Sequence, residues 1–430
     1  MTARVLAHRA VIYTLASLGN SAIPFLLLPL LTRVLSPADY GVVVVFATAI
    51  TVAGAFTGLS VHGAVNVRYH DASVDIARYT GTALCILGAS TVAVLLVALL
   101  AGERIAAWSG IPRGWLFVAI LVSAAQFVVQ VRLVTWQAQG MAVRFGLLQV
   151  LQTAVNLSLS VLLVVPSDWS WNLGWQGRAA GIAAATLLAG AASLWLLQRR
   201  REVAWQPRRE YVRDALRFGV PLVPHVIGGV AVANSDRIVI AGLAGLHEAG
   251  IYAASMQLGM LVAVLADAVV KALSPWIYAN LGASDSVVRE RIVRVSYLFF
   301  AGMLVVAMLT ALGARWLLHL VGSAFRGSDD VLAFVALGSA FGGMYLMVVS
   351  YIFFARRNEW LSLISLSVGA FNFALTWWLV GQRGAVGAAQ AFAVSQFLMF
   401  ACTWYAASRC CPMPWRQGLR NLLGRRPAGA

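Results

Sequence analysis

The sequence predicts an all-α polytopic membrane protein with twelve transmembrane helices in two six-helix halves. Three observations predict this fold class: the composition, the spacing of apolar segments, and the distribution of basic residues. The chain is 60% hydrophobic and only 11% charged, with a mean hydropathy of +0.80. A soluble domain carries about 25% charged residues. Spans of ~20 residues that cross hydrocarbon are therefore the structural units.

Apolar segments of spanning length recur along the whole chain. They lie at 11–33, 40–63, 80–101, 115–137, 144–165, 178–198, 218–243, 250–273, 293–313, 331–355, 360–380 and 384–408. The longest basic connection, QRRREVAWQPRREYVRDALRFG, separates the sixth span from the seventh. We therefore expect an N-terminal bundle over 1–198, a basic cytoplasmic linker over 199–217, a C-terminal bundle over 218–408 and a basic cytoplasmic tail over 409–430.

The basic residues test this span count independently. The formal net charge is +16, and with both termini in the cytoplasm 22 cations fall on the cytoplasmic side against 7 on the outer side. This asymmetry satisfies the positive-inside rule, and one missed or added helix would invert every later loop. The bases therefore set topology, and we expect no nucleic acid as a partner.

The two halves contain a weak internal repeat. The run DYG at 39–41 follows the first span, and EAG at 248–250 follows the seventh. Later in each half, Asn156 and Asn372 precede a short outer loop and a helix of small residues. Parallel repeats are related by an axis along the membrane normal, and transporter sites usually lie between them near the midplane. The repeat therefore predicts a binding site between the halves.

Five charged residues lie within predicted spans: Arg132, Asp236, Arg237, Asp267 and Lys271. Each costs ~2.5–3.5 kcal/mol at a helix centre, so such residues usually face a cavity or one another. We expect the three cations to line the cavity and bind an anionic substrate, and the two acids to bind H⁺ or Na⁺ and couple transport to its gradient. Two alternatives stay open: the Arg of the adjacent pair reaches the interface, and the acid and Lys four residues apart pair on one helix face.

Motifs of catalysis and metal binding are missing from the sequence. The four cysteines lack metal or disulfide spacing, and no zinc, Walker or nucleophile-elbow motif occurs. The outer loops are too short for an extramembrane catalytic domain. We therefore expect a secondary transporter that is not an enzyme and that uses no cofactor and no metal.

Two stretches resemble a known family. The run PLLTRVLSPADYGVVVVFATAI resembles the start of the Wzx-type oligosaccharide-lipid flippases, the polysaccharide transporters of the multidrug/oligosaccharidyl-lipid/polysaccharide exporter superfamily. The positions that carry this resemblance are Arg33, Leu35, Ser36, Pro37, Asp39, Tyr40 and Gly41. The stretch NSDRIVIAGLAGLHEAGIYAASMQLG is similar to the family's seventh-helix signature, through Asp236, Arg237, Gly250 and Tyr252, with Pro275 following. Asn156 and Asn372 fit its fifth- and eleventh-helix pattern.

The resemblance implies a fold of two pseudo-symmetric six-helix bundles around a central cavity, and it also implies a substrate and a process. The substrate is an undecaprenyl-diphosphate-linked oligosaccharide, which alternating access moves from the inner to the outer leaflet of the bacterial inner membrane for O-antigen of lipopolysaccharide, capsule or exopolysaccharide. Membrane lipids and other polysaccharide-assembly membrane proteins are the expected partners. Two alternatives remain: an ion-coupled multidrug or cation exporter of the same superfamily, and a membrane glycosyltransferase or polymerase.

Overall fold

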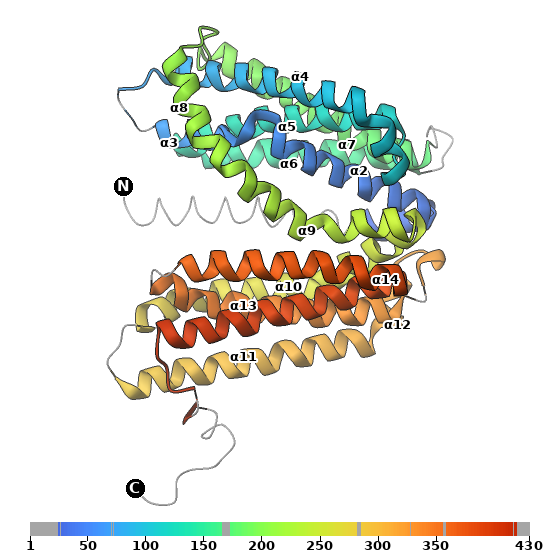
Figure 1. The fold of residues 1–430 in the computed structure, drawn as a ribbon, viewed down its shortest axis with the longest axis vertical. Helices are drawn as coiled ribbons and strands as arrows, with labels where there is room; N and C mark the ends of the chain where they lie inside the picture. Colours follow the sequence, from blue (N-terminus) through green and yellow to red (C-terminus); the bar gives the residue numbers. More distant parts are fainter. Residues whose placement is uncertain are drawn as a thin grey trace, which may run out of the picture. The chain divides into compact units, whose positions relative to one another are not determined.

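The computed structural model describes residues 25, 27–69, 71, 73–165, 173–281, 285–326, 328–355, 358–415, 417 and 418. Every element of regular structure in these ranges is a helix (Figure 1). The chain divides into two compact units, Met1–Gly250 and Ile251–Ala430.

Helices α2 to α9 belong to the first unit. Their bounds are α2 Pro37–Phe56, α3 His62–Arg68, α4 Ile76–Ser109, α5 Arg113–Ala138, α6 Ala142–Val164, α7 Gly174–Arg199, α8 Arg209–Gly219 and α9 Val223–Leu243. Helix α5 packs against α2, α4 and α7, and α9 packs against α2. Residues 27–34 are also helical. Because so many helices contact α5, it forms the centre of this unit.

Helices α11 to α14 and most of α10 belong to the second unit. The bounds are α10 Leu246–Leu281, α11 Ser286–Leu312, α12 Ala314–Leu317, α13 Asp329–Phe354 and α14 Asn358–Cys410. Helix α13 packs between α11 and α14. A core of Phe299, Phe300, Met344, Tyr351 and Phe400 joins these three helices.

In the described part of the chain, nine helices are long and apolar enough to cross a membrane. Seven predicted spans, 80–101, 115–137, 144–165, 178–198, 250–273, 293–313 and 331–355, each coincide with one such helix. Helix α9, which carries the adjacent acid and base, overlaps the span predicted at 218–243 but is not among the nine. Most of the first predicted span lies outside the described residues.

Two predicted spans have different boundaries in the structure. The span predicted at 40–63 ends as an α-helix at Phe56, because Gly58, Leu59 and Ser60 take positive φ angles of 73°, 47° and 57°. Glycine enters this region without the steric cost that side chains add. The Gly58 N–H donates to the Ser90 hydroxyl at 2.8 Å, so the freed backbone group keeps a partner.

The last two predicted spans, 360–380 and 384–408, both lie in α14. This element covers 53 residues and is interrupted at Gly384, whose φ of 54° and ψ of −134° are not helical. The two helical segments follow each other directly instead of being separated by the expected loop. A single glycine therefore makes the whole turn between them.

The first of the two stretches that carry the resemblance forms the N-terminus of α2. Ser36 is the N-cap of α2, and its hydroxyl accepts the Asp39 N–H at 3.1 Å. Pro37 occupies the first turn, where its missing N–H costs no hydrogen bond. The Asp39 carboxylate accepts the Ser36 hydroxyl at 2.7 Å and lies at the positive end of the helix dipole. The Ser-Pro-x-Asp spacing thus encodes a helix N-terminus.

The segment predicted as a linker, 199–217, packs on the first unit. Helix α7 ends at Arg199, and the Ala204 N–H then donates to the Ala77 carbonyl at 2.8 Å. The Asp214 carboxylate on α8 accepts hydrogen bonds from Arg68 and from the Tyr79 hydroxyl. The boundary between the compact units falls later, after Gly250. The division of the chain at 199–217 stays a prediction.

Two glycines bring the starts of α2 and α10 together. A Cβ on Gly41 would lie 2.0 Å from the Leu246 carbonyl oxygen, and one on Gly250 would lie 1.8 Å from the Pro37 carbonyl oxygen. Both neighbours are backbone atoms, so neither can turn aside as a side chain does. These are the glycines of the DYG and EAG runs, and their role is close helix contact.

Replacing either glycine should destabilise the protein. We expect Gly41→Ala and Gly250→Ala to lower the melting temperature by about 5 °C, because overpacking costs ~1–3 kcal/mol. Thermal unfolding in detergent, followed by circular dichroism, measures this. Gly54→Ala is the matched control on α2, since nothing lies within 4 Å of its added Cβ. Equal melting temperatures for all three variants would contradict the assigned contact.

The attachment of α8 should depend on pH. The hydrogen bond from Arg68 lowers the pKa of the Asp214 carboxyl below its ordinary 3.8. A carboxylate with a depressed folded pKa stabilises the structure above its unfolded pKa and loses this effect as pH falls through the folded pKa. We therefore expect hydrogen-exchange protection factors of α8 to be constant from pH 7 to 5 and to fall below pH 3.8.

Asp214→Asn should remove this pH step and leave α8 weakly protected throughout. Helix α6 contains no Asp or Glu and serves as the internal reference. A step of the same size in Asp214→Asn would show that another group controls α8.

Candidate functional site

A partly buried arginine joins α6 to α7. Arg178 Nη1 donates to the Asn156 side-chain oxygen Oδ1 at 2.6 Å and to the Ser160 hydroxyl. Two glycines of α7 allow this approach, because a Cβ on Gly177 would lie 2.5 Å from the Leu163 carbonyl oxygen and one on Gly181 would lie 2.8 Å from the Ser160 hydroxyl. Small residues at helix interfaces let backbones approach closely in membranes.

Arg178 was expected in an outer loop, since the sequence placed the start of the sixth span at 178. The helix begins at Gly174, which places this arginine one turn inside it. The signal that could have found it is the spacing of Gly174, Gly177 and Gly181, which continues the small-residue helix face towards the N-terminus. Its partner Asn156 was predicted as a site residue, and the structure gives that residue a defined contact.

A second arginine lies on α9. Arg237 Nη1 donates to the Asn234 side-chain oxygen at 3.1 Å, and the Arg237 backbone N–H donates to the Asp236 carboxylate at 2.8 Å. Asp236 is buried, with 8% of its surface exposed. The Asp236 carboxylate thus accepts from the Arg237 backbone, while the Arg237 guanidinium donates to Asn234.

Tyr40 lies on the helix that packs against the helices of both arginines. Its side chain is buried in α2, and α2 contacts α7, which carries Arg178, and α9, which carries Arg237. Side chains from α2, α6, α7 and α9 thus converge within the first unit. We call this group the cationic cluster; its members are Tyr40, Asn156, Ser160, Arg178, Asn234 and Arg237.

The charge of the cationic cluster is not neutralised by a salt bridge. Among the described residues, neither Arg178 nor Arg237 has a carboxylate within ion-pair distance, and the Nε of each is buried without a hydrogen-bond partner. Charged groups in membrane segments are normally paired or functional. The cluster therefore has donors that can receive an anion.

Arg132, the first predicted substrate cation, has other partners. Its side chain is completely buried, forms an ion pair with Glu202, and stacks over the Trp136 ring at 4.3 Å. Glu202 also accepts from Gln139 at 2.9 Å. In this conformation Arg132 attaches α5 to the segment after α7. Since Arg178 lies near the other end of α7, about 30 Å away along that helix, the structure does not bring these two cations together.

The remaining predicted charges lie in the second unit. Lys271 and Asp267 form an ion pair at 2.6 Å within α10, with side-chain exposures of 69% and 43%. This is the i, i+4 pair that the sequence left open as an alternative. The role of either residue in substrate or ion binding stays a prediction.

The motif residues of the resemblance fall into several structural roles. Tyr252 is fully buried in α10, Gly41 and Gly250 make the close helix contact, and Arg33 is exposed. Pro275 lies in α10, but its side chain is outside the described part of the structure. Asn372 on α14 accepts from the Ser395 hydroxyl at 2.9 Å.

The two asparagines share a local geometry. Seven residues after each, a leucine carbonyl oxygen lies against a glycine of the following helix. The Leu163 oxygen lies 2.5 Å from a Cβ placed on Gly177, and the Leu379 oxygen lies 2.2 Å from one on Gly387. This pairing sets Arg178 opposite Ala388. Each half therefore contains the same kind of helix contact. The residue after the glycine is Arg178 in the first half and Ala388 in the second.

Comparison with known proteins agrees with this architecture. Residues 6–281, more than half of the chain, match the family described as polysaccharide biosynthesis protein. A relative from Haemophilus influenzae, the "Lsg locus putative protein 1", is 24% identical over 360 residues, which are 82% of this chain and 86% of the relative. A second Haemophilus influenzae relative, an uncharacterized membrane protein, is 25% identical over 361 residues, which are 82% and 85% of the two chains.

Solved structures show the same fold. The lipid II flippase MurJ in an inward closed conformation aligns with 96% of this chain and 90% of its own, with a TM-score of 0.72 and 11% identity. A multidrug resistance MATE family transporter of the MOP superfamily in an inward-facing conformation aligns with 97% and 96%, with a TM-score of 0.66 and 16% identity. The protein is thus a multi-pass membrane protein with a transporter fold, as the resemblance implied. The chain belongs to the polysaccharide biosynthesis protein family.

Proposed function

We propose that this protein is a flippase that moves an oligosaccharide linked to undecaprenyl diphosphate across the bacterial inner membrane by alternating access. The glycan would enter O-antigen, capsule or exopolysaccharide. Family membership supports the link to polysaccharide biosynthesis. The observation that carries the proposal for this chain is the cationic cluster, with two arginines whose charge no described carboxylate neutralises.

The chemistry of the cluster fits a diphosphate. An arginine guanidinium is planar and presents donors in a fixed fork, which matches the oxygens of a phosphate. The Nε of Arg178 and of Arg237 is buried without a partner in the described structure. The neutral groups Asn156, Ser160 and Asn234 hold the guanidiniums in place without cancelling their charge.

The arrangement we propose consists of twelve spans in two six-helix bundles around a central cavity, with both termini in the cytoplasm. The helical segments on both sides of Gly384 and the helix of residues 27–34 fit this span count. The common helix contact at Leu163 and Leu379 supports the internal repeat. Asp236 and Asp267 remain the proposed sites for H⁺ or Na⁺ coupling.

An ion-coupled exporter of cationic drugs would need a site of opposite sign. A cation is attracted by carboxylates and aromatic faces, whereas the cationic cluster holds two arginines around one tyrosine. The cluster therefore favours the flippase over this alternative, and over a membrane glycosyltransferase or polymerase, which needs catalytic groups.

Neutralising the cluster should abolish transport. In a deletion strain we expect Arg178→Gln and Arg237→Gln each to reduce surface polysaccharide about tenfold or more, because a lost charge-assisted hydrogen bond costs ~1.5–3 kcal/mol. Lipid-linked precursor should accumulate on the cytoplasmic side. Gel analysis of both pools, at equal membrane abundance of the variants, measures the effect.

Arg383→Gln is the matched control, since Arg383 is an exposed arginine that contacts Gln390 on α14. Full surface glycan in both cluster variants would refute the assignment of these cations to the substrate. An intact glycan pattern in the deletion strain itself would favour the exporter.

Arg132 should act through Glu202. We expect Arg132→Glu to reduce membrane abundance strongly, since breaking a buried ion pair costs about 3–5 kcal/mol. The double exchange Arg132→Glu with Glu202→Arg should restore part of the abundance and of the transport activity. Quantitative immunoblotting and glycan analysis measure the two properties. Restored abundance without any transport would instead assign Arg132 to the substrate.

A further inference from the structure

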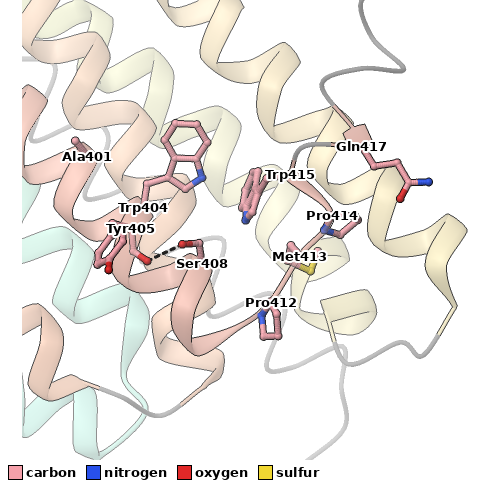
Figure 2. A pocket seen from close by; sticks show the side chains of 9 residues that line it. All are labelled: Ala401, Trp404, Tyr405, Ser408, Pro412, Met413, Pro414, Trp415 and Gln417. Carbon is pink, nitrogen blue, oxygen red and sulfur yellow. Dashed lines mark hydrogen bonds between the residues drawn. The ribbon is translucent and has the colours of Figure 1, made fainter. Parts of the chain in front are cut away.

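The second unit contains a pocket that the proposed transport cycle does not use. It lies between the last turns of α14 and the segment that follows, with a volume of about 710 Å³. Its lining residues are Ala401, Trp404, Tyr405, Ser408, Pro412, Met413, Pro414, Trp415 and Gln417. Figure 2 shows Trp404, Tyr405 and Ser408 on α14 and Met413, Pro414 and Trp415 on the chain segment that follows it, with the Trp404 and Trp415 side chains next to each other. Ligand pockets have volumes of about 300–1,000 Å³ and are mostly apolar with few polar groups.

The wall formed by residues 412–415, 417 and 418 packs against α11 and α14. The Trp415 ring makes edge contacts with Trp404 at 5.5 Å and with Tyr297 at 5.8 Å, and the Tyr297 hydroxyl donates to the Trp415 carbonyl at 3.3 Å. Gly418 is buried against Val293 of α11. These contacts fix the wall of the pocket in place.

Two arginines, which we call the arginine rim, contact residues that line the pocket. Arg409 stacks over the Tyr405 ring at 5.2 Å and donates to its hydroxyl at 3.0 Å. Arg289 on α11 donates to the Pro412 carbonyl. In the described structure neither forms an ion pair with a carboxylate. The sequence from 405 to 430 contains five arginines and no acid.

We propose that this pocket binds one anionic glycerophospholipid of the cytoplasmic leaflet. Its apolar, aromatic wall lies where α14 leaves the membrane span and suits the upper part of an acyl chain. The arginine rim suits a phosphate head group, and aromatic rings commonly lie at this depth. Basic pockets at the cytoplasmic ends of transmembrane helices bind anionic lipid head groups. The cytoplasmic placement follows from the predicted topology.

Native mass spectrometry of the full-length protein tests the site. The protein in detergent is titrated with dioleoyl phosphatidylglycerol or with dioleoyl phosphatidylcholine, and bound lipids are counted. We expect one tight phosphatidylglycerol molecule, at least fivefold tighter than phosphatidylcholine. The double variant Arg289→Gln with Arg409→Gln should weaken phosphatidylglycerol binding about 25-fold, since each basic residue near an anionic surface contributes about fivefold. Ser408→Trp should fill the pocket and displace it.

The control is Arg291→Gln with Arg294→Gln, which changes the net charge equally on exposed positions of α11. Equal binding of both lipids would overturn the proposal, as would an equal loss in the control, which would indicate general surface attraction. Displacement of phosphatidylglycerol by stoichiometric undecaprenyl phosphate would assign the pocket to the substrate chain instead. Because the double variant changes one exposed and one partly exposed side chain, it remains informative if Ser408→Trp fails to fold.

Discussion

Hydrocarbon offers no hydrogen bonds, and this constraint determines how the polar groups of the chain are arranged. The described backbone forms helices almost throughout, and hydroxyl side chains return their hydrogen bonds to the preceding turn, as Thr135 does to the Val131 carbonyl at 2.7 Å. Where the helix is interrupted at Gly58, a serine from α4 supplies the acceptor. Charged groups follow the same rule, since Arg132 pairs with Glu202 and Lys271 pairs with Asp267. Against this background, the arginines of the cationic cluster stand out because their partners are neutral.

The transmembrane segments could be predicted from the sequence because hydropathy is summed over some 20 residues, and a few misjudged positions hardly change the sum. The start of α2 could also be predicted in outline, since Ser36, Pro37 and Asp39 encode a cap through local contacts. The break at Gly58 could not. The Gly58 N–H donates to Ser90, which lies 32 residues further along the chain. Local composition does not predict such a contact.

The sequence indicated charged residues within the spans, but it did not indicate which residues contact one another. In-span charge indicated Arg237 and Arg132, and the repeat indicated Asn156. The partner of Arg132 lies 70 residues away, in a segment that reads as a solvated linker. Arg178 was counted with the outer loop because its helix begins a turn earlier than hydropathy indicates. In this first turn Gly177 packs against Leu163. Hydropathy averaged over a sequence window does not predict such tertiary packing.

The asymmetry between the halves bears on how a carrier with this site releases its substrate. Both halves use a glycine against a leucine carbonyl, yet Arg178 of the first half corresponds to a small alanine in the second. A ligand shifts a conformational equilibrium only by its difference in affinity between the states. For the diphosphate substrate that we propose, a cationic cluster whose members all lie in the first unit keeps these phosphate contacts within one unit. Such contacts can stay similar in the two states of the proposed transport cycle, so that the anion does not trap either one.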